Sequence, residues 1–170
     1  MLLDAGRVPC PLGIAQGESL ELASKGTYDR GYLGVPLLKA GRWADGSRAI
    51  RQVIASVRLA SEVREAYLLC LQANSGDFPA HTDTDFGTDD GQKARFHLPL
   101  ITHPSVRLYL WDSAGSRTDH HMLVGHVYYF DPRNPHAIGN PSATNRIHLV
   151  VDVTVDQAVR RLIGAAQEAV

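Results

Sequence analysis

The sequence predicts an all-β core of sandwich or barrel type with helices at its flanks. Short runs rich in β-branched and aromatic residues recur from residue 62 onward, and clusters of Gly, Pro, Asn and Asp separate them. Helical spacing of apolar residues is confined to two segments, one on each side of this region. We therefore expect strands joined by short turns to form the core and the helices to cover it.

The first third of the chain, residues 1–61, mixes both kinds of pattern. The segment "ESLELAS" alternates as an edge strand does, and Gly- and Pro-rich connections follow it. Further on, "GSRAIRQVIASVRLA" spaces Ile50, Val53, Ile54 and Val57 at helical intervals. We expect this helix to cover one face of a sheet, and residues 1–61 to pack on the core as strand and helix elements.

Residues 62–154 are expected to form the β core. The predicted strands are "VREAYLLCLQ", "RFHLPLI", "SVRLYLW", "GHVYYFD" and "RIHLVVDVTV". Residues 155–170 are expected to form a terminal amphipathic helix, because Asp156 stands in a capping position and Val159, Leu162 and Ile163 share one face.

Length and composition limit the classes of function. The chain has 170 residues and 44% hydrophobic content, enough for a single domain with one core. The net charge is −1 and the charges are dispersed, so we expect no nucleic-acid partner. Prolines and Asp4 interrupt the N-terminus where a signal peptide needs a continuous apolar stretch, and no segment reaches the length of a membrane span. With only Cys10 and Cys70 present, we expect a cytoplasmic protein with no membrane partner; the oligomeric state is left open.

One short segment, "PAHTDTDFGTDD", concentrates a histidine and several carboxylates. In an extended chain, residues two apart point to the same side, so His81 and Asp83 can offer two ligands to one ion. A solvated acidic loop is the alternative, and we assign Asp85, Asp89 and Asp90 to it.

A third candidate ligand, His136, follows a Pro-rich turn in "YYFDPRNPHAIGN". Two histidines and one carboxylate match the facial triad of non-haem Fe(II) oxygenases, which leaves coordination positions open. Ten positions later, Arg146 opens an otherwise apolar strand. A guanidinium is costly there unless it meets an anion.

Four motifs occur in order, "HTD", "RFHLPLI", "GHVYYFDPRNPHAIGN" and "RIHLVVDV", and together they resemble the aspartyl/asparaginyl β-hydroxylase family of 2-oxoglutarate-dependent oxygenases. The resemblance covers residues 62–153. It implies a double-stranded β-helix, the jelly-roll or cupin-like architecture. It also implies Fe(II) and 2-oxoglutarate as cofactors. The implied metal ligands are His81, Asp83 and His136, and the implied 2-oxoglutarate-binding residues are Arg95, His97 and Arg146.

The carboxylate of Asp83 indicates which members of the family the chain resembles more. Animal members of the family lack it, so the chain is more similar to bacterial hydroxylases of free amino acids. Iron halogenases carry a small residue there to make room for chloride, so Asp83 favours hydroxylation. We therefore expect an Fe(II)/2-oxoglutarate-dependent dioxygenase that hydroxylates a small amino-acid-like or aspartyl/asparaginyl-type substrate, free or peptidyl. The alternatives are a cupin metalloenzyme that does not use 2-oxoglutarate and a non-catalytic cupin-like binding or sensor module.

Overall fold

The computed structural model describes residues 1–7, 32–57, 59 and 62–168. These residues form eleven strands and two helices. The strands are β1 (Leu3–Arg7), β2 (Tyr32–Lys39), β3 (Arg42–Trp43), β4 (Val63–Leu71), β5 (Gly76–Asp77), β6 (Lys93–Ile101), β7 (Arg107–Trp111), β8 (Arg117–His120), β9 (His126–Tyr129), β10 (His136–Asn140) and β11 (Arg146–Thr154). The helices are α2 (Arg48–Val57) and α3 (Gln157–Glu168).

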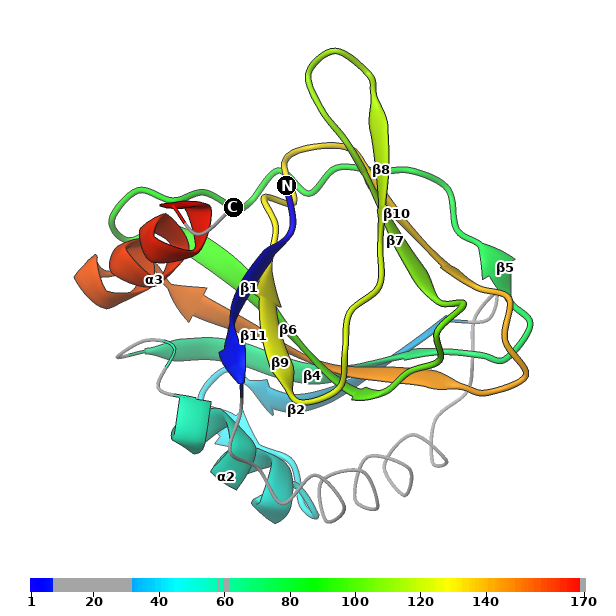
Figure 1. The fold of residues 1–170 in the computed structure, drawn as a ribbon. Helices are drawn as coiled ribbons and strands as arrows, with labels where there is room; N and C mark the ends of the chain where they lie inside the picture. Colours follow the sequence, from blue (N-terminus) through cyan, green and yellow to red (C-terminus); the bar gives the residue numbers. More distant parts are fainter. Residues whose placement is uncertain (8–31, 58, 60–61, 169–170) are drawn as a thin grey trace.

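Two antiparallel sheets face each other (Figure 1). The larger has the order β1-β9-β6-β11-β4-β2-β3 and the smaller the order β5-β10-β7-β8. Strands distant in sequence are therefore neighbours, as when β11 pairs with both β4 and β6. This is the jelly-roll arrangement, and the predicted fold class is confirmed.

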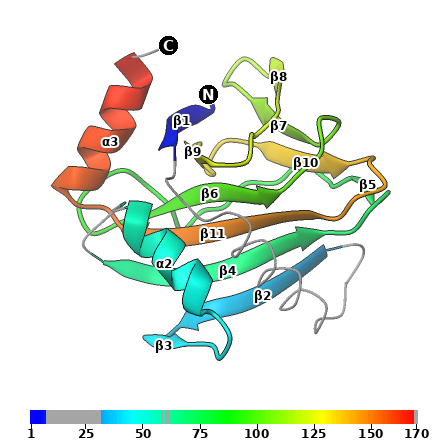
Figure 2. The same ribbon diagram turned by 60° about the horizontal axis from the view of Figure 1, so that its bottom comes forward.

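Side-chain alternation in the central strands builds the main core on the outer face of the larger sheet. Helix α2 lies across this face (Figure 2), and its residues Ile50, Val53 and Ile54 join the core, as do Val159 and Ile163 of α3. Each strand contributes every second residue. These are Ala66, Leu68 and Cys70 of β4, Ala94, Phe96, Leu98 and Leu100 of β6, and Ile147, Leu149, Val151 and Val153 of β11.

The inner face of the larger sheet is different, because several of the intervening residues of β6 and β11 are polar. They are Arg95, His97, Arg146, His148 and Asp152, and all but Arg95 are buried. A second apolar cluster, which includes Leu108 and Phe130, lies between the two sheets. The space enclosed by the sheets therefore combines apolar walls with buried charge.

Both helices and five of the strands in the described residues match the sequence predictions. The two predicted helices correspond to α2 and α3, and the Asp156 carboxylate caps α3 by accepting from the Val159 amide at 2.9 Å. The five predicted strands correspond to β4, β6, β7, β9 and β11. Sequence analysis did not predict the other strands, which are β1, β2, β3, β5, β8 and β10. The predicted edge strand "ESLELAS" lies outside the described residues.

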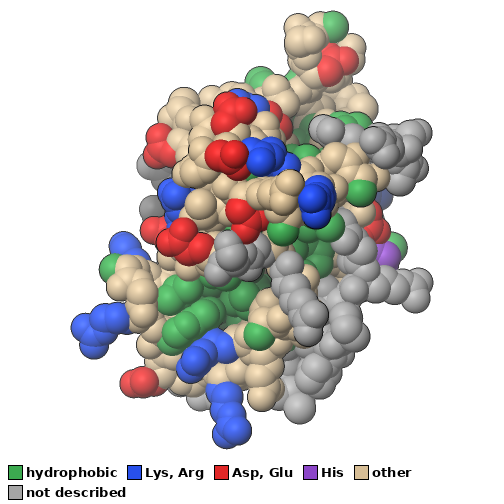
Figure 3. Space-filling view, turned by 90° about the vertical axis from the view of Figure 1, so that its left-hand side faces the viewer, with side chains coloured by type: hydrophobic (Ala, Val, Ile, Leu, Met, Phe, Trp, Pro, Cys, Tyr) green, Lys and Arg blue, Asp and Glu red, His purple; other side chains and the backbone are tan. Residues whose placement is uncertain are grey.

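The surface carries mixed charge on the face seen in Figure 3, where acidic and basic side chains are interspersed. This is the pattern of a solvated surface. Within the described part of the chain, neither helix has the length and apolar character needed to cross a membrane.

Candidate metal centre and adjoining pocket

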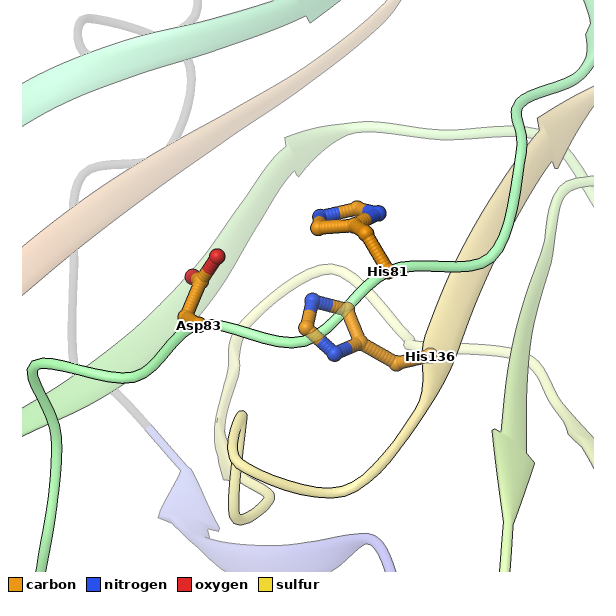
Figure 4. Close-up of side chains that lie close together, drawn as sticks. All are labelled: His81, Asp83 and His136. Atoms are coloured by element: carbon orange, nitrogen blue, oxygen red, sulfur yellow. The ribbon is translucent and has the colours of Figure 1, made fainter.

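His81, Asp83 and His136 come together at one end of the space between the sheets. Their potential ligand atoms all lie within 4.8 Å of one another. The two imidazoles and the carboxylate face a common space (Figure 4). His81 and Asp83 belong to the connection between β5 and β6, and His136 is the first residue of β10.

Backbone hydrogen bonds hold this connection against the start of β10. His81 and His136 exchange N–H···O bonds in both directions, each 2.9 Å long, as an isolated antiparallel bridge. The Asp83 amide donates to the carbonyl of Pro132 at 2.8 Å. Two residues after the bridge, the chain is thus still extended enough to direct Asp83 to the same side as His81.

The ring orientations suit metal binding. The Nδ1 atoms of His81 and His136 lie 3.2 and 3.0 Å from the carbonyls of Pro79 and Asn134. Because a carbonyl only accepts, each Nδ1 carries the proton and each Nε2 keeps its lone pair. Burial also lowers the pKa of His136, which favours the neutral, ligating form.

The Asp83 carboxylate is held from the sheet side by Arg95. Arg95 Nη1 donates to Asp83 Oδ2 at 2.8 Å, while Nε and Nη2 donate to the two carboxylate oxygens of Asp152 at 2.8 and 3.0 Å. Burial opposes the charge of Arg95, but the hydrogen-bonded Asp152 and neighbouring acids outweigh it and raise the pKa. Arg95 therefore stays a cation next to the candidate metal ligands.

Farther in, three basic side chains are buried with unmet hydrogen-bonding capacity. Arg146 is 1% exposed, and its only hydrogen bond within the described residues is from Nη2 to His148 Nδ1, at 2.6 Å. Its Nε and Nη1 have no partner there, and neither has His148 Nε2 or either ring nitrogen of His97. Burial lowers the pKa of Arg146 to about 9. A buried guanidinium with unpaired donors is costly, and an anionic ligand would pair with those donors.

His97 supplies a neutral donor beside the Arg146 guanidinium. Its ring stacks on Phe130 with centroids 5.2 Å apart and planes 20° apart. Burial lowers the pKa of His97 well below its ordinary value, and the neighbouring charge of Arg146 adds to the effect. The ring is therefore neutral, with one N–H to donate.

One pocket of about 440 Å³ extends from the group of His81, Asp83 and His136 to the buried side chain of Arg146. All six predicted site residues line it: His81, Asp83, Arg95, His97, His136 and Arg146. Its remaining walls are largely apolar and include Leu69, Phe130 and Ile138. A small dicarboxylate fits this arrangement, with one end toward the triad and the other toward the unpaired donors of Arg146.

Sequence reasoning missed two residues of this region, Asp152 and His148. Both belong to "RIHLVVDV", where polar residues at 146, 148 and 152 share the inner face of β11. Their even spacing could have predicted that these polar side chains share one face. The strand is mostly apolar, however, and was interpreted as a core strand.

Comparison with known proteins gives two kinds of match. A family model described as aspartyl/asparaginyl beta-hydroxylase matches residues 47–155. By sequence, no curated protein matches the chain.

Several solved structures share the fold at low identity. AviO1 from Streptomyces viridochromogenes Tue57 is 17% identical, with 92% of this chain and 90% of that chain covered and a TM-score of 0.64. A Pseudomonas putida prolyl-4-hydroxylase is 14% identical, with coverages of 91% and 92% and a TM-score of 0.57. The non-heme alpha ketoglutarate dependent epimerase SnoN from nogalamycin biosynthesis is 13% identical, with coverages of 89% and 76% and a TM-score of 0.64. At these identities the likeness establishes the jelly-roll fold.

Proposed function

The chain belongs to the aspartyl/asparaginyl β-hydroxylase family, and from this premise we propose that it hydroxylates a small amino-acid-like substrate at the centre formed by His81, Asp83 and His136. The protein is an Fe(II)/2-oxoglutarate-dependent oxygenase, and its cofactors are Fe(II) and 2-oxoglutarate. The assignment of individual residues and of the substrate is our proposal.

The observation that carries the proposal is the joint position of the triad and the unpaired Arg146 in one pocket. In this assignment His81, Asp83 and His136 hold Fe(II), which with 2-oxoglutarate and O₂ supplies the oxidising chemistry for breaking a C–H bond. Arg146 binds the distal carboxylate of 2-oxoglutarate, since its planar fork matches a carboxylate. A cupin enzyme that does not use 2-oxoglutarate has no need of this buried cation.

The remaining residues of the pocket orient the cosubstrate and shield the buried donors from water. Neutral His97 donates a hydrogen bond to the cosubstrate without adding a second buried charge. Apolar walls such as Leu69 and Phe130 keep water from the buried donors, which strengthens each polar contact. The protein thus contributes placement and a dry environment.

The substrate class rests on Asp83 and on the residues at the pocket mouth. Asp83 supports a likeness to bacterial hydroxylases of free amino acids. Tyr32 and Phe78 meet edge to face with ring centroids 6.4 Å apart and line the same pocket. We propose a small substrate, either a free amino acid or a single aspartyl- or asparaginyl-type side chain presented by a peptide.

Turnover of 2-oxoglutarate tests the proposal directly. Protein loaded with Fe(II) is incubated in air with 2-oxoglutarate and with a panel of free amino acids and short peptides. We expect succinate to form in step with a product that has gained one oxygen atom, measured by mass spectrometry. If the iron-loaded protein forms no succinate with any member of the panel, the binding-module alternative gains support.

A further inference from the structure

We infer that Asp152 and Arg95 form a positioning pair for the metal ligand Asp83, in which Asp152 orients and neutralises Arg95 and Arg95 fixes the Asp83 carboxylate. The inference rests on the proposed role of Asp83 as a metal ligand. It assigns Asp152 a function in metal binding, although this residue lines no part of the pocket. It also replaces the expected contact of Arg95 with 2-oxoglutarate by a contact with a metal ligand.

The pair is built into the centre of the larger sheet. Asp152 of β11 stands directly opposite Arg95 of β6 in the strand register, and both point to the inner face. Asp152 is 0% exposed and accepts two hydrogen bonds from the guanidinium. The Arg95 guanidinium also lies 4.4 Å from the ring centroid of Phe86 and 5.6 Å from that of Tyr67. Its orientation is therefore fixed by the sheet.

Asp83 needs such a support because it lies in a connection between strands. Its side chain is 26% exposed, so in isolation it would sample several rotamers. The 2.8 Å hydrogen bond from Arg95 Nη1 reaches Oδ2 and leaves Oδ1 for the ion. The rigid sheet thus confines a carboxylate that the connection alone would leave mobile.

Charge explains why Asp152 is part of the arrangement. A lone guanidinium beside the triad would repel a divalent cation, and low surrounding polarity would strengthen the repulsion. The buried Asp152 carboxylate offsets the charge of Arg95, to which it is bonded at 2.8 Å. Lys93, which is farther from it, has its Nζ 3.7 Å from Asp152 Oδ2. The negative charge of Asp83 is then available to the metal.

Arg95 has limited capacity for 2-oxoglutarate in this arrangement. Its Nε, Nη1 and Nη2 already donate to two carboxylates. The donors of Arg146, by contrast, are largely unpaired. The two arginines therefore serve opposite ends of the pocket.

The test measures Mn(II) affinity in the absence of 2-oxoglutarate, by titration monitored through the EPR signal of free Mn(II). Asp152→Asn should weaken Mn(II) binding by about 10- to 100-fold, the usual range for supporting partners of metal ligands. The double variant Arg95→Gln/Asp152→Asn removes both charges, so its affinity should lie between those of Asp152→Asn and the wild type. Asp85→Asn is the matched control, because it removes an exposed carboxylate two positions from Asp83 and should change affinity by less than about twofold.

Arg95→Lys provides a second route if Asp152→Asn fails to fold. Lysine keeps the charge but loses the fork that bridges two carboxylates, so Mn(II) binding should again weaken. The affinity of Mn(II)-saturated protein for 2-oxoglutarate, measured by calorimetry, should stay near the wild-type value. Weaker 2-oxoglutarate binding with unchanged Mn(II) binding would place Arg95 at the cosubstrate and overturn the inference.

The inference and the proposed function can fail separately. If the wild type binds no Mn(II), the metal-site assignment itself is wrong. If the wild type binds Mn(II) and Asp152→Asn binds it as tightly as the Asp85→Asn control does, only the positioning pair is wrong.

Discussion

The two ends of the pocket are built in opposite ways. At the proposed metal end, two of the three candidate ligands, His81 and Asp83, lie in the connection between β5 and β6 (Figure 4). His81 is exposed. At the deep end, Arg146 and His148 lie on the central strand β11, and each is 1% exposed. The first end is accessible to an incoming ion, whereas the second is buried on a central strand of the sheet.

Because of this difference, we expect substitutions at the two ends to affect ligand binding and protein stability differently. Substitutions at the metal end should change metal affinity and leave the core intact, because the connection holds few core residues. At the deep end the same buried groups affect both, since a guanidinium without an anion is costly in the folded state. Binding of 2-oxoglutarate should then also stabilise the fold, as any ligand of the native state does.

Asp83→Gly should have the largest effect on ligand binding, and it tests the metal end of the pocket. It removes one ligand and one negative charge, so Mn(II) affinity should fall by roughly 100-fold or more, beyond the loss of a supporting partner. Succinate formation at ordinary iron concentrations should be lost. The free energy of unfolding should fall by only about 0.5–1.5 kcal/mol, the usual contribution of one hydrogen bond, because Arg95 keeps Asp152 as a partner.

Asp89→Gly is the matched control for that experiment. Asp89 is an exposed residue of the same acidic segment. Its amide, which bonds to Gln92 Oε1, remains in a glycine. Turnover should stay near the wild-type value. If instead Asp89→Gly loses activity and Asp83→Gly keeps it, the carboxylate ligand lies farther along the segment.

Arg146→Ala tests the deep end and should have the next largest effect. Loss of a buried, charge-assisted contact weakens 2-oxoglutarate binding by about 2–5 kcal/mol, so its KM should rise steeply. Mn(II) binding, measured separately, should persist because the triad is untouched. Arg133→Ala is the control, since this exposed arginine pairs with Asp131 on the connection before β10. An unchanged KM in folded Arg146→Ala would place the anchor elsewhere in the pocket.

Sequence analysis selected the three candidate ligands but not the residues around them. His81, Asp83 and His136, which the structure brings together, were selected because their residue types and the His-x-Asp spacing are typical of a metal site. Asp152 was missed because its role depends on pairing with Arg95, 57 positions earlier. No local pattern encodes that register, which is set when β6 and β11 align their apolar faces against the helices.

The same reasoning accounts for the fold. Strands β4, β6 and β11 were predicted because nine residues each provide a clear run of strand-forming residues. By contrast, β5 has two residues and β8 four, with no buried residue in either. Such strands form because a neighbouring strand supplies hydrogen-bonding partners, and this information is absent from their own sequence.

The smallest expected effect is a pH dependence of stability. It tests whether the deep end of the pocket excludes water. Burial lowers the pKa of His148 well below its ordinary value, and the neighbouring charge of Arg146 lowers it further. The unfolded chain binds a proton at this histidine near pH 6.5, whereas the folded chain does not. The free energy of unfolding should therefore fall as the pH drops below about 6.5, with His148 contributing up to about 1.4 kcal/mol per pH unit.

His148→Leu isolates this contribution from those of the other seven histidines in the chain. Denaturant unfolding of metal-free protein without 2-oxoglutarate is measured at several pH values from about 7.5 to 5. The variant should be less stable at every pH because Arg146 loses the hydrogen-bond partner that it has among the described residues. The slopes are therefore compared and the absolute values are not. The variant's slope should be the shallower one below pH 6.5. Parallel curves would mean that His148 takes up its proton in the folded state, which requires water at the deep end and would remove the contrast between the two halves of the pocket.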